Sequence, residues 1–269
     1  MAAERGTLAV NVITLEHAEA IVEGAERAGS PVLLQLSQNA VRFHGSPRPI
    51  LAACRELARA AAVPVGIHFD HLDDPALIDE VIALAREFDV GSMMIDFATR
   101  EFESNVAATA DAVRRGHGVG LWVEAELGAI GGKDGAHAPG VRTDPDEAAA
   151  FVAATGVDAL AVAVGSSHAM RDRAATIDLP LVERLAAAVP VPLVLHGSSG
   201  VPDDAIATAI AAGIRKVNVG TALNIAGTGA TRALLGEQPD LVDPRPAALA
   251  ARVAMADVVA HLCAVVARR

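Results

Sequence analysis

Residues 65–96 read VGIHFDHLDDPALIDEVIALAREFDVGSMMID, and this stretch indicates the fold most directly. A short apolar run at 65–69 is followed by an amphipathic segment at 74–88 and by a second short apolar run at 92–96. Short apolar runs that alternate with longer amphipathic segments are typical of strand–helix–strand units with parallel strands. The stretch therefore predicts one βαβ unit.

The same alternation continues on both sides of this unit without a low-complexity linker. Strands are predicted at Leu8–Asn11, Val32–Gln35, Val65–Phe69, Ser92–Asp96, Leu121–Glu126, Ala159–Ala163, Leu193–His196 and Val217–Val219. Helices are predicted at 15–28, 48–61, 74–88, 102–115, 145–154, 179–188, 203–212, 222–235 and 245–267. Eight βα units in about 235 residues are typical of a closed barrel, so we expect the α/β class and a single (β/α)8 TIM-barrel domain over residues 1–269 with a C-terminal helical extension. A doubly wound open sheet is the main alternative, but no G-x-G-x-x-G follows the first strand.

Composition and charge argue against several classes of protein. The chain of 269 residues is 52% hydrophobic and 20% charged, which is ample for a large core. Its formal net charge of −11 argues against nucleic acid or an anionic membrane as partner, because both are polyanions. We see no signal peptide and no run of roughly 18 apolar residues, and Cys54 and Cys263 do not resemble a disulfide framework. We therefore expect a cytoplasmic protein that acts on a small molecule.

Polar side chains gather where the predicted strands end. In a (β/α)8 barrel the carboxyl ends of the strands form the catalytic face. The polar or glycine-rich positions there are Asn11, Ser37, Asp70, His71, Asp96, Glu126, His168, His196 to Gly200, and Asn218 to Thr221. We expect these residues to meet at one mouth of the barrel.

Three of the nine histidines, His71, His168 and His196, follow three of these strands at nearly equivalent positions. Three neutral imidazoles with an open fourth position form the ligand set of a catalytic Zn²⁺. A lone histidine is more often an ordinary core or surface residue, but three at converging strand ends favour one zinc ion per chain. His68 lies inside its strand, which favours a structural role or a hydrogen bond to a ligand.

Asp70 directly precedes His71, where a carboxylate can stand beside a metal without binding it. This is the place of a general acid/base. A helix N-cap is the structural alternative, but Asp73 and Asp74 already serve the next helix. Asp96 and Glu126 have three open roles: orienting a ligand histidine, holding a second metal position, or satisfying buried backbone donors.

Two glycine-containing turns follow the last two predicted strands. Gly197-Ser198-Ser199-Gly200 and Asn218-Val219-Gly220-Thr221 each open a predicted helix, where backbone N–H groups can bind a phosphate. The loops after strands seven and eight are the usual phosphate site of barrels. Either turn alone is a weak signal, and the pair is a stronger one.

Several motifs follow one another through nearly the whole chain. They are Ala9-Val10-Asn11-Val12, Pro31 to Ser37, His68-Phe69-Asp70-His71, Ser92 to Asp96, Val123 to Gly128 with Gly131-Gly132, Gly165 to His168, Leu195 to Gly200, and Lys216-Val217-Asn218-Val219. In this order they resemble the class II, metal-dependent ketose-bisphosphate aldolases, which include the fructose- and tagatose-bisphosphate aldolases. The resemblance implies a lyase of carbohydrate metabolism.

The resemblance also implies roles for individual residues. Asp70 would be the acid/base for the hydroxyl at the cleaved carbon, while zinc polarises the ketose carbonyl and stabilises the enediolate. The implied zinc ligands are His71, His168 and His196, flanked by Asp96 and Glu126. The implied contacts to dihydroxyacetone phosphate are Gly197, Ser199 and Asn218, and we extend this set to Asn11, Ser37, Ala169, Ser198, Val219, Gly220 and Thr221. A monovalent cation and assembly into a homo-oligomer, dimer or tetramer, are further expectations.

Three positions depart from the family pattern. Ala169 stands where Gly is usual, Gly220 where Asp or Ala is usual, and Asp134 where a Glu of the loop after strand five takes part in proton transfer. We therefore expect Asp134 to assist Asp70 and Glu126 in catalysis, with a weaker or broader choice of ketose.

Three other functions compete with this one. A Schiff-base aldolase needs a lysine, and only Lys133 and Lys216 are present. A non-catalytic barrel that serves as a partner subunit of another aldolase would be expected to lose the acid/base or a ligand, and none is lost. A zinc-dependent hydrolase or epimerase would use the same metal, and it is distinguished by the reaction it catalyses.

Overall fold

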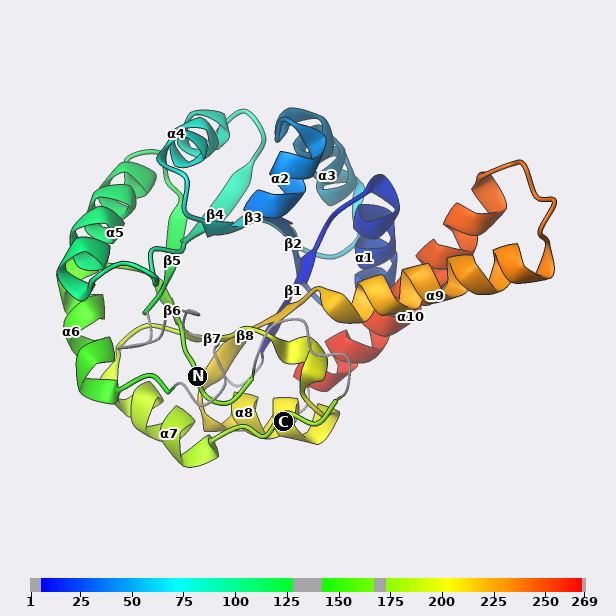
Figure 1. Ribbon diagram of the computed structural model, residues 1–269. Coiled ribbons are helices and arrows are strands. Elements are labelled where there is room, and N and C mark those ends of the chain that lie inside the picture. Colours follow the sequence, from blue (N-terminus) through cyan, green and yellow to red (C-terminus); the bar gives the residue numbers. More distant parts are fainter. Residues whose placement is uncertain (1–5, 128–141, 167–172, 268–269) are drawn as a thin grey trace.

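The computed structural model describes residues 6–127, 142–166 and 173–267. Its strands form a closed parallel barrel in the order β1 to β8, with helices around the outside (Figure 1). The strands are β1 Thr7–Asn11, β2 Val32–Ser37, β3 Val65–Leu72, β4 Val90–Ile95, β5 Trp122–Glu126, β6 Ala159–Ala161, β7 Leu193–Leu195 and β8 Ile214–Val219. The predicted (β/α)8 fold is confirmed, and every predicted strand overlaps an observed one.

The helices follow the predicted ranges closely. They are α1 Leu15–Ala28, α3 Arg48–Ala60, α4 Pro75–Leu84, α5 Phe102–His117, α6 Pro145–Thr155, α7 Leu179–Ala188, α8 Asp203–Ala212, α9 Thr221–Glu237 and α10 Arg245–Val266. The start of α6 shows why the sequence marks these bounds. The Asp144 side chain accepts hydrogen bonds from the N–H groups of Asp146 and Glu147, and Pro145 occupies the first turn.

Two short elements were not predicted, α2 Gln38–His44 and the 3-10 turn η1 Ser198–Gly200. Ser37 is the N-cap of α2, since its Oγ accepts a hydrogen bond from the N–H of Ala40. The helix has only 7 residues, too few to show a clear apolar period. Ser37, which was expected to face the barrel mouth, therefore also caps a helix through its hydroxyl group.

Two kinds of side chain fill the barrel. Apolar residues of the strands pack outward against the helices and form the main core. The interior of the barrel is instead rich in buried polar groups, namely Gln35, His68, Asp70, Ser92, Glu124, Glu126, His196, Lys216 and Asn218. Buried polar groups require hydrogen-bond partners, so this interior is a connected polar layer below the barrel mouth.

Helices α9 and α10 lie side by side and project beyond the ring of helices (Figure 1). By length and composition alone α10 could span a membrane, with a mean hydropathy of 1.8, although no such run was recognised in the sequence. Val and Leu carry most of this value, and Arg252, Asp257 and His261 interrupt the run, which is why it did not stand out. Within the fold α10 packs on α1 and α9 and buries Met255, Ala256, Val259 and Leu262 in the main core.

Candidate active site

Asp70 and His71 both face the mouth of the barrel, although they are neighbours on β3. Neighbouring residues of a regular strand point to opposite faces. Here Phe69 pairs with Met93 and Leu72 with Ile95, so that two residues of β3 stand opposite one residue of β4. This β-bulge, together with the φ of 51° at His71, turns both side chains toward the same cavity.

Three side-chain amides surround the Asp70 carboxylate. Gln35 Nε2 donates to Asp70 Oδ2 at 3.0 Å, and Asn11 Nδ2 donates to the same oxygen at 3.4 Å. Asn218 Nδ2 lies 3.5 Å from Asp70 Oδ1. Burial raises the pKa of Asp70, while the positive charges of His71 and Lys216 oppose this shift. The result is a carboxylate that is fixed in position and more basic than one in water, as a general base requires.

His71 and His196 meet across the mouth with a defined choice of ring nitrogen. His71 Nδ1 lies 2.8 Å from Asp96 Oδ2, and His196 Nε2 lies 2.9 Å from Glu124 Oε1. When these nitrogens carry the protons toward the carboxylates, the other two, His71 Nε2 and His196 Nδ1, present lone pairs to each other at 3.1 Å. Two facing lone pairs repel each other unless a cation lies beside both.

Without a metal, a proton supplies that cation. Burial by itself lowers the pKa of His71, but the carboxylates of Asp70, Asp96 and Glu126 outweigh it and raise the pKa to about 10. A divalent metal ion would supply the charge instead. One ligand atom each from Asp70, His71 and His196 lie within 4.8 Å of one another, as do those of His71, Asp96 and Glu126. Neutral imidazoles with nearby carboxylates fit Zn²⁺.

Glu124 belongs to this site, although sequence reasoning did not select it. Its Oε2 is 2.7 Å from Lys216 Nζ, and its Oε1 contacts His196. Lys216 Nζ is also 3.2 Å from His68 Nε2, and His68 Nδ1 is 2.8 Å from Ser92 Oγ. His68 was expected to be structural or to support a ligand, and it lies at the far end of this chain of contacts. The sequence signal for Glu124 was a carboxylate two residues before Glu126, on the same face of β5.

A cavity of about 240 Å³ opens beside Asp70 and His71. It collects most of the residues expected to bind substrate, and it is lined by Asn11, Ser37, Gly197, Ser199, Asn218, Gly220 and Thr221, with Ile13, Gln35 and Asn224 in addition. Of the expected residues that the structure describes, two do not line it. Ser198 is buried and its hydroxyl donates to the carbonyl of Leu195 at 3.1 Å, while Val219 is buried on the outer side of its strand. A serine that follows a glycine in a tight turn can face either way, so the sequence did not settle this.

The absence of a side chain at Gly220 has a steric reason in this structure. A Cβ at this position would lie 2.8 Å from Asn11 Oδ1. The glycine therefore makes room for the Asn11 amide, which in turn reaches Asp70. The departure from the family pattern at this position affects the surroundings of Asp70 as well as the phosphate turn.

Other sequence-predicted residues do not join the cavity or cannot be placed. His168, Ala169 and Asp134 lie outside the described residues, as does Lys133. Glu126 is buried on β5 with its Oε2 4.0 Å from His196 Nδ1. Gln35 was missed as a site residue; its signal was a polar residue within the otherwise apolar run from Val32 to Leu36.

Comparison with known proteins agrees with this geometry. A family model described as fructose-bisphosphate aldolase class-II matches residues 1–268. The fructose-bisphosphate aldolase of Thermus caldophilus is 38% identical over 94% of this chain and 90% of its own length. The D-tagatose-1,6-bisphosphate aldolase subunit GatY of Klebsiella oxytoca is 36% identical, with 95% and 90% covered. The solved structure of the YdjI aldolase from Escherichia coli K12 superposes with a TM-score of 0.83 at 32% identity, covering 97% of this chain and 91% of that one.

Proposed function

The chain belongs to the class II fructose-bisphosphate aldolase family, and from this premise we propose that it cleaves and forms a carbon–carbon bond of a phosphorylated ketose, with dihydroxyacetone phosphate as the ketone fragment. The observation that carries the proposal is the meeting of Asp70, His71 and His196 around one point at the barrel mouth. The membership itself makes the protein an aldehyde-lyase. The identity of the ketose fragment and the residue roles are our inference.

We propose that one zinc ion is held by His71 Nε2, His196 Nδ1 and His168. Zinc bound there would act as a Lewis acid toward the ketose carbonyl. Asp96 fixes the ring of His71 through the contact at Nδ1, so it orients a ligand. Glu126 lies close enough to His196 to take part in a second metal position. We also propose that a monovalent cation binds.

Asp70 then acts on the hydroxyl at the carbon where the bond breaks. Its oxygens receive hydrogen bonds from Gln35 and Asn11, which leave the carboxylate charged and pointed at the cavity. In cleavage the carboxylate takes the hydroxyl proton, and in the reverse direction it returns the proton. Asp134 and Glu126 are the further groups we propose for proton transfer.

The cavity also offers groups for the hydroxyl and phosphate ends of the ketose. Gln35 Oε1 and Asn218 Oδ1 are buried acceptors without a hydrogen-bond partner among the described residues, and both residues line the cavity. Hydroxyl groups of the ketose would satisfy them. The turns at Gly197 and Gly220 would hold the phosphate through backbone N–H groups, since no lysine or arginine is among the described residues that line this cavity.

The competing functions fit the geometry less well. Lys216 Nζ is held by Glu124 and His68 below the cavity and is not among its lining residues, which disfavours a Schiff base. A non-catalytic subunit would not be expected to keep the arrangement of Asp70, His71 and His196. A hydrolase or epimerase would share the metal site, and a product assay separates it.

We also propose that the chain forms a homo-oligomer through the projecting helices. Large apolar side chains are exposed on α9, α10 and the turn between them, namely Ile225, Leu235, Val242, Leu249 and Val253. A monomer gains nothing from exposing such a surface, whereas a second copy could cover it. Light scattering of the wild type and of L249E/V253E tests this, with the variant expected to have the lower mass.

The buried free thiols of Cys54 and Cys263 are compatible with a reducing compartment, and we retain the cytoplasm as the proposed location.

A direct assay tests the proposed reaction. Protein stripped with a chelator and reloaded with zinc is incubated with fructose 1,6-bisphosphate or tagatose 1,6-bisphosphate, and release of dihydroxyacetone phosphate is measured. We expect cleavage only after zinc is restored, and no covalent adduct after borohydride treatment. Full activity of metal-free protein, or an adduct on Lys216, would contradict the proposal.

A further inference from the structure

We propose that the buried Lys216–Glu124 ion pair is the positioning device for His196, holding its ring so that Nδ1 faces the metal. Neither residue would contact the metal or the substrate. The inference rests on the proposed function, because it assumes that a metal binds at His71 and His196. It adds to that function the two groups that act from below the site.

The geometry forms a continuous path of polar contacts from Lys216 through Glu124 to His196. Lys216 Nζ donates to Glu124 Oε2 at 2.7 Å, and Glu124 Oε1 lies 2.9 Å from His196 Nε2. All three side chains are buried: the exposed fraction is 8% for Lys216, 1% for Glu124 and 0% for His196. Contacts this short between buried charged groups restrict the ring of His196 far more than packing alone would.

The charges decide which nitrogen of His196 is unprotonated. A carboxylate paired with an ammonium group can only accept hydrogen bonds, so the proton of His196 lies on Nε2 and its lone pair on Nδ1. Asn218 Nδ2 is also 3.0 Å from Nε2 and could donate only to an unprotonated nitrogen, but the charge-assisted contact to Glu124 at 2.9 Å is the stronger of the two and keeps the proton on Nε2. Asp96 has the same effect on His71 with the nitrogens exchanged, which leaves its Nε2 unprotonated.

Lys216 is the counter-ion of Glu124 inside the barrel. Glu124 without a counter-ion would be a buried, uncompensated charge, which is strongly unfavourable. Lys216 supplies that charge, and its second contact is to the Nε2 of His68, whose pKa is held well below 6.5 by burial and by Lys216 itself. A neutral His68 can accept from the ammonium and donate to Ser92, so the support extends from β8 to β4.

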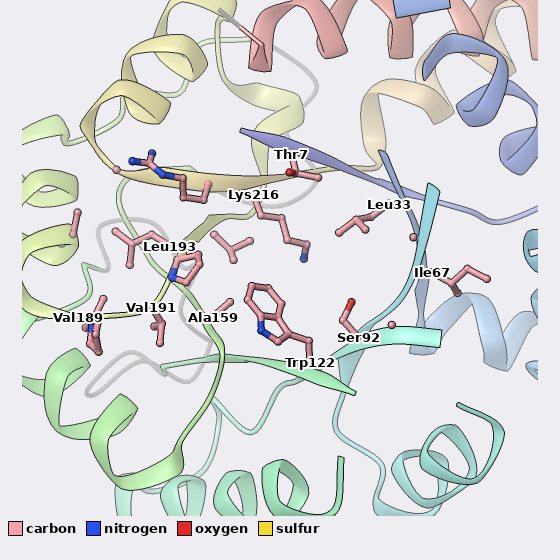
Figure 2. Close-up of a pocket in the computed structure, with 18 residues that line it drawn as sticks. Thr7, Leu33, Ile67, Ser92, Trp122, Ala159, Val189, Val191, Leu193 and Lys216 are labelled. Atoms are coloured by element: carbon pink, nitrogen blue, oxygen red, sulfur yellow. The ribbon is translucent and has the colours of Figure 1, made fainter. Parts of the chain in front are cut away.

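The barrel offers a route for testing this from its opposite end. A hollow of about 900 Å³ opens at the amino ends of the strands, and Lys216 and Trp122 project into it (Figure 2). A small amine can therefore reach position 216 without passing through the candidate active site. Arg215 lines the same hollow, but its Nη1 donates to the carbonyls of Ile210 and Ile214. It is the matched control, a cation on the same strand that does not touch Glu124.

The experiment measures metal binding by the full-length protein rather than turnover. Zinc affinity is determined by competition with a chromophoric chelator, and the absorption spectrum of the Co²⁺ form reports the ligand geometry. We expect K216M and E124L each to weaken zinc binding by roughly ten- to a hundred-fold and to alter the Co²⁺ spectrum. E124Q, which keeps an acceptor oxygen, should lose less than E124L, and R215M should bind as the wild type does.

Two further measurements separate positioning from general damage to the barrel. If Lys216 acts through Glu124, the neutral double variant E124L/K216M should bind zinc no more weakly than E124L alone. In K216A, propylammonium added to the buffer should restore part of the zinc affinity, and it should do nothing for E124L. Thermal unfolding of the metal-free variants identifies any that fail to fold.

The outcomes distinguish this inference from the proposed function. If the wild type bound no metal, the proposed function itself would fail. If the wild type bound zinc tightly while K216M and E124L matched it, or if the losses in the double variant were additive and propylammonium had no effect, then the ion pair would only stabilise the fold and the positioning role would be wrong.

Discussion

The side-chain amide of Gln35 donates a 3.0 Å hydrogen bond to Oδ2 of Asp70, from the neighbouring strand of the barrel. This contact joins a residue that the sequence did not single out to the one that it singled out most clearly. Asn11 donates to the same oxygen. The carboxylate is thus held by donors that carry no charge, so it stays basic while its position is fixed.

The first prediction concerns Asp70 itself. Replacing it by Asn keeps the shape and removes the proton acceptor, so D70N should lose about two to four orders of magnitude in kcat for cleavage. Zinc content should remain that of the wild type, because we assign the metal to the histidines. Steady-state rates together with metal analysis check both parts. Normal turnover by D70N would mean that the proton travels elsewhere, with Asp134 the next candidate.

The second prediction concerns the ligands. H196A should lose zinc, since removing one of three imidazoles leaves the ion with too few ligands. A matched control is H117A, because His117 is half-exposed and contacts Asp158 on the outside of the barrel. Metal analysis after gel filtration compares the two variants. Retention of a full equivalent of zinc by H196A would rule out this residue as a ligand.

The third prediction follows from the raised pKa of His71. In the metal-free protein this pKa is about 10, against an ordinary value of 6.5. A pKa that is higher in the folded state stabilises the fold fully below about pH 6.5, and this contribution is lost as the pH rises toward about 10. Zinc must displace the proton, so zinc binding should release about one proton between these limits and strengthen as pH rises.

Calorimetry in two buffers of different ionisation enthalpy measures that proton release at pH 8. The metal-free H71Q variant provides the comparison for stability, because its unfolding free energy should lack the decline over the same pH range. Zinc binding without proton release at pH 8 would show that His71 is already neutral.

The barrel and the acidic and histidine positions at its mouth were accessible from sequence because they depend on periodicity and on strand ends. Asp70 and His71 could be named since both follow an apolar run. Their joint orientation could not, because it depends on a bulge and on a positive φ at His71. Such features arise from the pairing of β3 with β4, and no local pattern encodes them.

The supporting residues were less accessible for a related reason. Gln35, Glu124 and Lys216 lie within strands, and only closure of the barrel brings these strands around one axis. Ser198 shows the reverse case. It was expected to contact the phosphate, and its hydroxyl donates to the carbonyl of Leu195 within the turn.

The fourth prediction concerns Gly220. In G220A the new Cβ would meet Asn11 Oδ1 at 2.8 Å and displace the Asn11 amide from Asp70. The φ of −135° at this position is not left-handed, so it does not by itself require glycine, and thermal unfolding checks that the variant folds. We expect kcat/KM to fall about tenfold, equivalent to about 1.4 kcal/mol of lost transition-state stabilisation, while zinc affinity stays unchanged. The shorter side chain in N11S/G220A should relieve the clash. Full activity of G220A alone would show that the contact between Asn11 and Asp70 is unimportant.

The last prediction concerns how the ketose is selected. The phosphate would be bound by the turns at Gly197 and Gly220 and by Ser199, whose Oγ already accepts from the N–H of Ala222 at 3.1 Å and keeps its own hydrogen for a ligand. Without a cation in the described lining, this binding is weaker than a charge-assisted site. We therefore expect S199A to raise the KM for the ketose phosphate several-fold with little change in kcat.

The other end of the substrate lacks an assigned arginine, since Arg173 is engaged with Asp203 and Arg100 lies over the ring of Phe97. Fructose and tagatose 1,6-bisphosphates and the matching 1-phosphates should accordingly differ by no more than about tenfold in kcat/KM, equivalent to about 1.4 kcal/mol. A strong preference for one bisphosphate that disappears in R142A or R232A would show that a second phosphate is recognised after all.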